Sequence, residues 1–280
     1  MSTAPSRRPW VGARPAWVDD LRAVTLDFGN TLVPVRREDL RRAVELTVDE
    51  VLPDETPARR AAFLRAWAEE RERQFAEEVP AFREVDIAQR FVRVFARTRG
   101  MDAPPVGLRW DDEAAAAFSD GEEIDGAVEA YVRGFVAALP LPAGVGPLLA
   151  ALAARYRLAV LSNWPVAAAI DRYLEVAGWA PHLAVVVVSE RVGTIKPHPE
   201  IFRAAEAGLA AAGGPIPGPA ILHVGDDWVA DVVGAKRAGW RAAYLRDRPD
   251  ESPLPQSQRD DEVEADVELH RLTDLRRLLL

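Results

Sequence analysis

The chain has 280 residues, of which 49% are hydrophobic, so it can form a large buried core in one or two domains. Its formal net charge is −9, which gives no electrostatic basis for binding nucleic acid. It has no cysteine, which excludes disulfides, thiolate catalysis and thiolate-bound metals. The longest apolar runs are far shorter than a membrane span, and the basic N-terminus lacks the apolar segment of a signal peptide. We therefore expect a cytoplasmic protein with neither nucleic acid nor membrane as a partner.

The first half of the chain predicts a tail, one strand and a group of helices. Residues 1–18 are rich in proline and arginine without periodicity, and we predict a flexible tail there. An apolar strand follows at about 22–27. Apolar residues then recur at three- and four-residue spacing, which predicts helices over 39–52, 57–79, 86–99 and 124–139. Residues 35–140 are therefore predicted to form a helical cap domain.

After residue 144 the pattern changes to alternating helices and apolar strands. The strands are predicted at 157–163, 183–190, 220–226 and 241–246, with one more short strand and a final helix near the C-terminus. Continuous apolar strands separated by helices are typical of a parallel sheet covered on both faces. We predict an α/β core domain of residues 19–34 and 141–280, with a doubly wound, Rossmann-like sheet. Residues 247–262 are predicted to form an exposed loop.

The residues best suited to chemistry lie beyond the ends of these predicted strands. Asp27 ends the first strand, Ser162-Asn163 ends the second, and Asp226-Asp227 ends the fourth. Lys196 lies in the loop that follows the third. In open parallel sheets, sites form beyond the carboxyl ends of the strands, so we expect these side chains at one edge of the sheet.

Each of these residues also has an ordinary structural explanation. Asp27 could form a turn, Ser162-Asn163 is a common turn sequence, and Lys196 could be a solvated loop lysine. Asp226 and Asp231 could cap the helix predicted to begin near residue 230. Their occurrence in order, each after a strand, favours a functional site over these separate explanations.

Four motifs carry a resemblance to a known family. They are LDFGNTL (26–32), VLSNW (160–164), the lysine of GTIKPHPEIF (193–202) and HVGDDWVADVVGAKRAGW (223–240). With them the chain resembles the haloacid dehalogenase (HAD) superfamily, the large class of aspartate-nucleophile phosphatases and their relatives, from Val24 to the end. The resemblance implies that the helical segment is a C1 cap inserted after the first strand.

The resemblance also implies a nucleophile and a magnesium site. Asp27 would attack phosphorus and form an aspartyl phosphate. The residues implied to hold or assist Mg²⁺ are Asp27, the backbone carbonyl of Gly29, Asp226 and Asp231, with Asp227 as a weaker candidate. Hard oxygen ligands of this kind suit Mg²⁺, which keeps several of its waters.

Phosphate binding is implied for a second set of residues. The Ser162 hydroxyl and the backbone amide of Asn163 would bind phosphate oxygens, with Thr31 as an additional candidate. Lys196 would neutralise charge beside the nucleophile. A carboxylate attacking a phosphate dianion brings like charges together, so cations must stand close by. The expected substrate is a small phosphorylated metabolite.

One position departs from the family pattern. Phosphatases of this family usually carry a second aspartate two residues after the first, and this chain has Gly29 there. That aspartate protonates the leaving group, and general acid–base help of this kind is typically worth about 10²–10⁴ in rate. The substrate could instead be an acyl or aryl phosphate, whose leaving group needs no proton. Alternatively, Glu122, Glu123 or Asp125 of the cap could supply the acid, or the protein could bind its ligand without turnover.

Two other chemistries of the family are disfavoured. Phosphonate-cleaving members use a cap lysine, and residues 33–140 contain none. Dehalogenating members lack the acidic metal motif, which is present here as GDDWVAD (225–231).

Basic and aromatic residues near the motifs are further candidates for contact with substrate. Arg36 and Arg37 follow the first motif and could reach an anionic group, although solvated charges at a helix start are the simpler interpretation. Trp164 and Trp228 could stack on an aromatic leaving group, or they could pack in the core.

Overall fold

The computed structural model describes residues 13–105, 107, 117–259 and 262–280. It begins with the short 3-10 helix η1 (Ala16–Asp20), whose Val18 is buried against the core. This corrects part of the predicted flexible tail over residues 1–18, because an apolar contact holds its last residues in place. Residues 1–12 of that predicted tail lie outside the described residues.

Six parallel strands form one sheet in the order β3–β2–β1–β4–β5–β6. The strands are β1 (Ala23–Leu26), β2 (Arg157–Ser162), β3 (Val185–Val188), β4 (Ile221–Gly225), β5 (Arg241–Leu245) and β6 (Val267–Leu269). The chain moves outward from β1 to β3, returns to β4 and then moves outward to β6. The strand order therefore reverses between β1 and β4, which is where sheets of this kind form their sites. The predicted doubly wound parallel sheet is confirmed.

Helices cover both faces of the sheet. One face packs against α6 (Val145–Ala153), α7 (Ala167–Val176) and α11 (Leu275–Leu279), and the other against α9 (Pro199–Ala211) and α10 (Gly234–Arg237). Successive residues of a strand point to opposite faces, so Val24 and Leu26 join the first core cluster and Ala23 joins the second. Because both faces are buried, the strands consist of continuous apolar runs rather than alternating ones.

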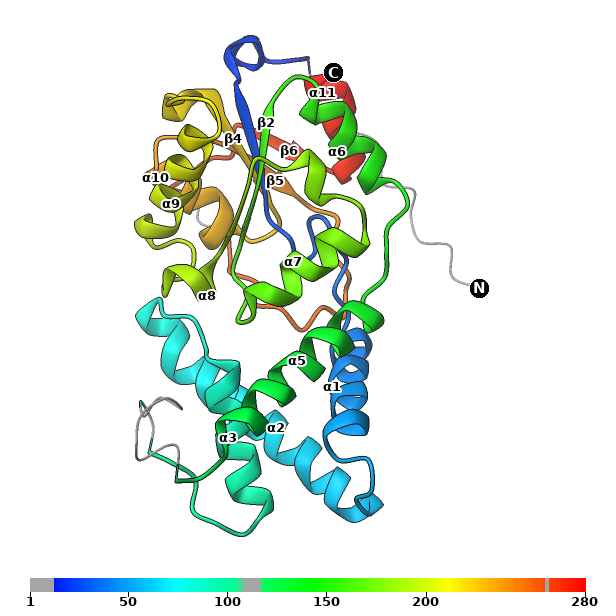
Figure 1. The fold of residues 1–280 in the computed structure, drawn as a ribbon. Helices are drawn as coiled ribbons and strands as arrows, with labels where there is room; N and C mark the ends of the chain where they lie inside the picture. Colours follow the sequence, from blue (N-terminus) through cyan, green and yellow to red (C-terminus); the bar gives the residue numbers. More distant parts are fainter. Residues whose placement is uncertain (1–12, 106, 108–116, 260–261) are drawn as a thin grey trace.

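The helical cap lies beyond one end of the sheet (Figure 1). Its described helices are α1 (Arg37–Val51), α2 (Pro57–Glu78), α3 (Ile87–Thr98) and α5 (Gly121–Ala138). Thr56 and Asp86 cap α2 and α3, since their side chains accept hydrogen bonds from the first-turn N–H groups. The cap has an aromatic core in which the Trp67 ring lies 4.9 Å from that of Phe91.

Several contacts between described residues seat the cap on the core. Arg83 pairs with Thr194 in an isolated antiparallel bridge, and the N–H of Ile195 donates to the Phe82 carbonyl at 3.0 Å. On the other side, Phe135 of α5 packs against Phe28, with 6.3 Å between the ring centroids. The cap thus lies over the carboxyl-terminal ends of the strands, close to the residues that follow β1 and to the loop before Lys196.

The remaining short elements connect these layers. They are η2 (Val79–Ala81), η3 (Ala180–His182), α8 (Ser189–Val192), η4 (Gly218–Ala220), the π-helix η5 (Trp228–Val233) and η6 (Leu272–Asp274). None of the described helices combines the length and the apolar character that crossing a bilayer requires.

Candidate active site

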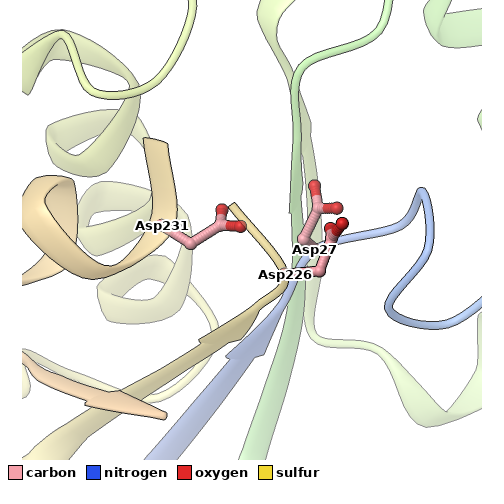
Figure 2. Close-up of side chains that lie close together, drawn as sticks. All are labelled: Asp27, Asp226 and Asp231. Atoms are coloured by element: carbon pink, nitrogen blue, oxygen red, sulfur yellow. The ribbon is translucent and has the colours of Figure 1, made fainter. Parts of the chain in front are cut away.

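Three aspartates lie close together at the carboxyl-terminal ends of the central strands (Figure 2). Asp27 directly follows β1 and Asp226 directly follows β4, and these strands are neighbours in the sheet. Asp231 comes from η5, which starts two residues after Asp226. One carboxylate oxygen from each of the three lies within 4.8 Å of the others. Three buried carboxylates this close are a set of hard oxygen ligands that fits a divalent cation.

A buried lysine joins two of these carboxylates. The Nζ of Lys196 lies 2.7 Å from Oδ1 of Asp27 and 2.7 Å from Oδ1 of Asp231. Its third hydrogen bond, at 2.8 Å, goes to the carbonyl of Leu161. Burial alone would lower the pKa of Lys196, but the two carboxylates outweigh it and raise the pKa above its ordinary value. Lys196 is therefore charged and held in one position.

Asp231 is fixed on both of its oxygens. Besides Lys196, its Oδ1 accepts from Nε2 of His223 at 3.1 Å, and its Oδ2 accepts from the N–H of Asp227 at 2.9 Å. Burial lowers the pKa of His223, so the ring is neutral. Burial would raise the pKa of Asp231, yet Lys196 and the His223 hydrogen bond hold it below its ordinary value. Asp231 thus remains ionised and orients Lys196.

The other two carboxylates have the opposite shift. Burial raises the pKa of Asp27 to about 6, because the charge of Lys196 only partly offsets the loss of water. Burial, together with the negative charges of Asp27 and Asp231, raises the pKa of Asp226 to about 8. Arg248 opposes this rise through an ion pair at 2.9 Å with Oδ2 of Asp226. The raised pKa values show that Lys196 and Arg248 do not fully stabilise the ionised forms of these carboxylates, so an additional cation that favours those forms would be stabilised here.

Ser162 and Asn163 sit at the end of β2, beside this cluster. The Ser162 hydroxyl is buried and has no hydrogen-bond partner in the part of the chain that the structure describes, although Ser162 lines the same cavity as Asp27. A buried hydroxyl without a partner is costly, and an anion in the cavity could satisfy it. The Asn163 side chain instead positions the backbone of Lys196, because it accepts from the Lys196 N–H at 2.7 Å and donates to the Lys196 carbonyl at 3.2 Å.

Thr31 lies apart from these two residues. Its hydroxyl is also buried without a partner within the described ranges. Thr31 lines a second hollow, which it shares with Asn30 and Arg36, and it is not among the described residues that line the cavity at Asp27. Sequence reasoning grouped Thr31 with Ser162 and Asn163, whereas the structure places it on the other side of the turn after β1.

The cavity has a volume of about 370 Å³ and lies between the core and the cap. Its lining includes the three aspartates, Ser162, Asn163, Lys196 and a set of mostly apolar cap residues. Glu122, Glu123 and Asp125 are not among the described residues that line it; the cap acid in the cavity is Glu84. Burial raises the pKa of Glu84 to about 7, against its hydrogen bond with Ser189.

The amino-acid sequence matches the family model of the haloacid dehalogenase-like hydrolases over residues 21–239. This match spans most of the chain and includes the first three motifs and all but the last residue of the fourth. The chain belongs to the haloacid dehalogenase-like hydrolase family. Hydrolases of this family typically use a divalent metal, in agreement with the oxygen ligands gathered at Asp27.

Individual relatives agree with this membership. The chain is 33% identical over 115 residues to the pyrimidine 5'-nucleotidase YjjG of Escherichia coli K12; the alignment covers 40% of this chain and 48% of that protein, about half its length. Among solved structures, the fold is similar to 2-haloacid dehalogenase from Pseudomonas syringae pv. tomato (24% identity, 92% of this chain, 98% of that chain, TM-score 0.61). It is also similar to the magnesium-bound HAD-hydrolase YfnB from Bacillus subtilis (20% identity, 92% and 98%, TM-score 0.56).

Gly29 departs from the pattern expected of a HAD phosphatase, and the structure shows what fills the space. A Cβ atom built on Gly29 would lie 2.6 Å from Cδ1 of Leu254. Leu254 belongs to the loop between β5 and β6, which was predicted to be exposed. The next residue, Asn30, has a positive φ of 57°, which asparagine tolerates better than most residues. An apolar side chain thus occupies the region into which a second aspartate would project.

The described residues of the predicted exposed loop 247–262 form a loop with none of them buried, as expected, but several of their side chains also contact the site. Besides Arg248 and Leu254, the loop contributes Ser252, which accepts from Nδ2 of Asn30 at 3.0 Å, and Ser257, which hydrogen-bonds to Asp227. Sequence reasoning did not assign Arg248 to the site. The signal was present, since Arg248 follows the end of β5 by three residues and so obeys the same strand-end rule as Asp27 and Asp226.

Of the basic and aromatic residues that the sequence suggested for substrate contact, one lines the cavity at Asp27 and the others lie elsewhere. Trp164 lines the cavity, but its ring is buried and packs on Phe135 with 5.1 Å between centroids. Trp228 is buried in the second core cluster and packs edge-on against Tyr244. Arg36 faces the second hollow, and Arg37 is not among the described residues that line the cavity.

Proposed function

We propose that this HAD-like hydrolase is a Mg²⁺-dependent phosphatase of a small phosphorylated metabolite and that it works through an aspartyl phosphate on Asp27. The observation that carries the proposal is the geometry of Asp27. Its carboxylate ends a central strand, faces a cavity, and is 2.7 Å from a charged lysine that Asp231 holds in place. The name of the E. coli relative, a pyrimidine 5'-nucleotidase, supports a phosphate ester as the substrate.

The residues present fit the cofactor. Asp27 and Asp226 would hold Mg²⁺ together with the backbone carbonyl of Gly29, and Asp231 would assist from beside them. When bound, the ion would supply positive charge that stabilises the oxygens of the phosphoryl group during transfer. Arg248, which pairs with Asp226, would have to share that carboxylate or withdraw from it.

The chain's own residues would perform two steps. An oxygen of Asp27 attacks phosphorus, the bond from phosphorus to the leaving oxygen breaks, and that oxygen departs with the electron pair. Water then attacks the phosphorus of the aspartyl phosphate, which releases phosphate and restores Asp27. Lys196 and the Ser162 hydroxyl would bind the phosphoryl oxygens throughout, since the Ser162 hydroxyl has no partner within the described residues.

The absent acid at Gly29 predicts the class of leaving group. With purified protein and Mg²⁺, we expect p-nitrophenyl phosphate and acetyl phosphate to be hydrolysed at least about 10²-fold faster than ethyl phosphate, because only the alkyl leaving group needs a proton. Phosphate release should stop on addition of EDTA. Equal rates on the three substrates would contradict the role assigned to Gly29. Halide release from a 2-haloacid that survives EDTA would replace the phosphatase proposal with a dehalogenase, and binding without turnover would indicate a ligand-binding protein.

Restoring the acid should need two changes. In the double variant Gly29→Asp/Leu254→Ala, we expect kcat/KM for ethyl phosphate to rise by about 10²-fold, because the new carboxylate has room beside the leaving oxygen. Gly29→Asp alone should gain less, since Leu254 must first leave its present rotamer. Leu254→Ala alone is the control and should give no gain on ethyl phosphate. A double variant no faster than this control would mean that position 29 is not aligned with the leaving group.

A further inference from the structure

A buried arginine of the cap faces the cavity without a full set of partners. Arg90, on α3, is 3% exposed and lines the cavity. Its Nε donates to Oε1 of Gln74 at 2.8 Å, and its guanidinium lies 4.9 Å from the ring centroid of Trp67. Its Nη2, by contrast, is buried with no hydrogen-bond partner in the described part of the chain. An arginine donor left unpaired at a cavity wall is a position at which a ligand can bind.

The charge of Arg90 is also not neutralised by an ion pair. No carboxylate of the described residues lies within 4.0 Å of its guanidinium. Glu84 and Glu70 are near enough to favour the charged form, but their oxygens are engaged elsewhere. Glu84 bonds to Ser189 and to the N–H of Val85, and Glu70 pairs with two other arginines of the cap. A buried, unpaired charge is costly, so an anion brought to Arg90 gains more than it would at the surface.

A second arginine extends the positive region toward the loop between β5 and β6. Arg71, on α2, also lines the cavity, is partly buried, and donates through Nη2 to the carbonyl of Pro253 at 3.2 Å. Tyr131 lines the cavity as well. Burial raises the pKa of its phenol, while the positive charges of Arg90 and Arg71 both oppose that rise.

The same cavity also contains the candidate phosphate site. Asp27, Ser162 and Lys196 line it from the core, whereas Arg90 and Arg71 line it from the cap. Apolar side chains line it as well, with Leu40, Phe75, Val79, Trp164 and Ile195 among them. The cavity therefore combines a nucleophile and a cation from the core, arginine donors from the cap, and apolar surface.

We propose that the substrate carries a second anionic group, distinct from the reacting phosphate, which Arg90 and Arg71 bind. The inference rests on the proposed function, which places the phosphoryl group at Asp27. A carboxylate suits the site because a guanidinium can donate two parallel hydrogen bonds to it. A second phosphoryl group offers the same kind of oxygens. The substrate class is thus a phosphate ester or acyl phosphate that carries apolar surface and a second acidic group.

Binding of matched non-hydrolysable probes tests this proposal independently of turnover. The probes are 4-carboxybenzylphosphonate, its neutral amide 4-carbamoylbenzylphosphonate, and 1,4-bis(phosphonomethyl)benzene, each titrated calorimetrically into the protein with Mg²⁺. We expect both probes with an anionic far end to bind about 10- to 100-fold more tightly than the amide, the range of one charged hydrogen bond. The tighter of the two identifies the second group as carboxylate or phosphoryl. The proposal would be overturned if the amide probe bound as tightly as the two probes that carry a second anionic group.

Variants assign the preference to the cap arginines. Arg90→Gln should reduce the preference for the charged probes to within about twofold of the amide. Arg93→Gln is the matched control: Arg93 is on the same helix, is also 3% exposed, and is not among the described residues lining the cavity, so the preference should remain. If Arg90→Gln does not fold, Arg71→Gln, at a more exposed site, should lower the preference at least about threefold. A full preference in a folded Arg90 or Arg71 variant would overturn the assignment.

Phosphate release from phenyl phosphate, measured in parallel, separates the two proposals. Turnover without any preference among the probes would remove the second-anion inference and leave the phosphatase intact. A clear preference without turnover of any phosphate ester would support the arginine site and remove the phosphatase.

Discussion

Asp27→Asn is expected to lower phosphate release from p-nitrophenyl phosphate by at least about 10³-fold, because an amide of the same shape cannot attack phosphorus. The variant should still fold, since Lys196 keeps its second carboxylate partner, Asp231. Initial rates with Mg²⁺ measure the loss, and thermal unfolding checks the fold. Wild-type protein incubated with acetyl phosphate should, after acid quenching, gain the mass of one phosphoryl group on the peptide that contains Asp27.

Asp171→Asn is a suitable control for this substitution. Asp171 is a partly exposed acid on α7 that pairs with Arg191 and lies outside the cavity lining, so the rate should stay near that of the wild type. If Asp27→Asn retained more than about a tenth of the wild-type rate, Asp27 would not be the nucleophile. Another group would then have to be sought among the residues of the cavity.

Lys196→Met is expected to lower the free energy of unfolding by about 3–5 kcal/mol, the cost of removing one partner of a buried ion pair. The Lys196 side chain is 2% exposed between its two carboxylates, and the substitution leaves Asp27 and Asp231 facing each other without it. Methionine is one atom shorter but keeps most of the apolar stem, so the loss reports mainly the charge and its hydrogen bonds rather than a cavity. Urea unfolding followed by circular dichroism measures the difference.

The chain provides its own comparison, because its other lysine is Lys236. Its ammonium group pairs with Asp266 at 2.8 Å but is about one-third exposed, and Arg241 contacts the same carboxylate. Lys236→Met should therefore cost less than about 1 kcal/mol. Equal losses for the two substitutions would mean that Lys196 is no more tightly coupled to its surroundings than a surface lysine.

The central sheet and the acidic site could be predicted because one rule governs both. Parallel strands end at the same edge, so residues that close separate apolar runs must meet there, however far apart they are in the sequence. That reasoning placed Asp27, Asp226 and Lys196 together, and in the structure Asp27 pairs with Lys196 and lies within 4.8 Å of Asp226. The boundaries of the strands and helices differ by only a few residues, as expected where periodicity is strong.

The rest of the site depends on contacts that leave no periodic signal. Leu254 and Arg248 lie in a Pro- and Ser-rich loop whose composition resembles that of an exposed segment, and only the folded chain shows that they cover Gly29 and Asp226. The cap poses a similar difficulty. The spacing of apolar residues predicts α3, but the sequence does not say that Arg90 on it would point into the cavity. For the same reason, the sequence did not show that Glu122, Glu123 and Asp125 lie outside the described cavity lining. The cap acid that does line the cavity, Glu84, lies in a loop.

The proximity of Gly29 and Leu254 also bears on how this chain could change over evolutionary time. A mutation that put aspartate at position 29 would appear first in a protein whose leucine already occupies that space, and selection would meet the crowding before any gain in rate. A smaller residue at position 254 would have to come earlier. The order of the two mutations would therefore decide whether a lineage descended from this protein can reach hydrolysis of alkyl phosphates.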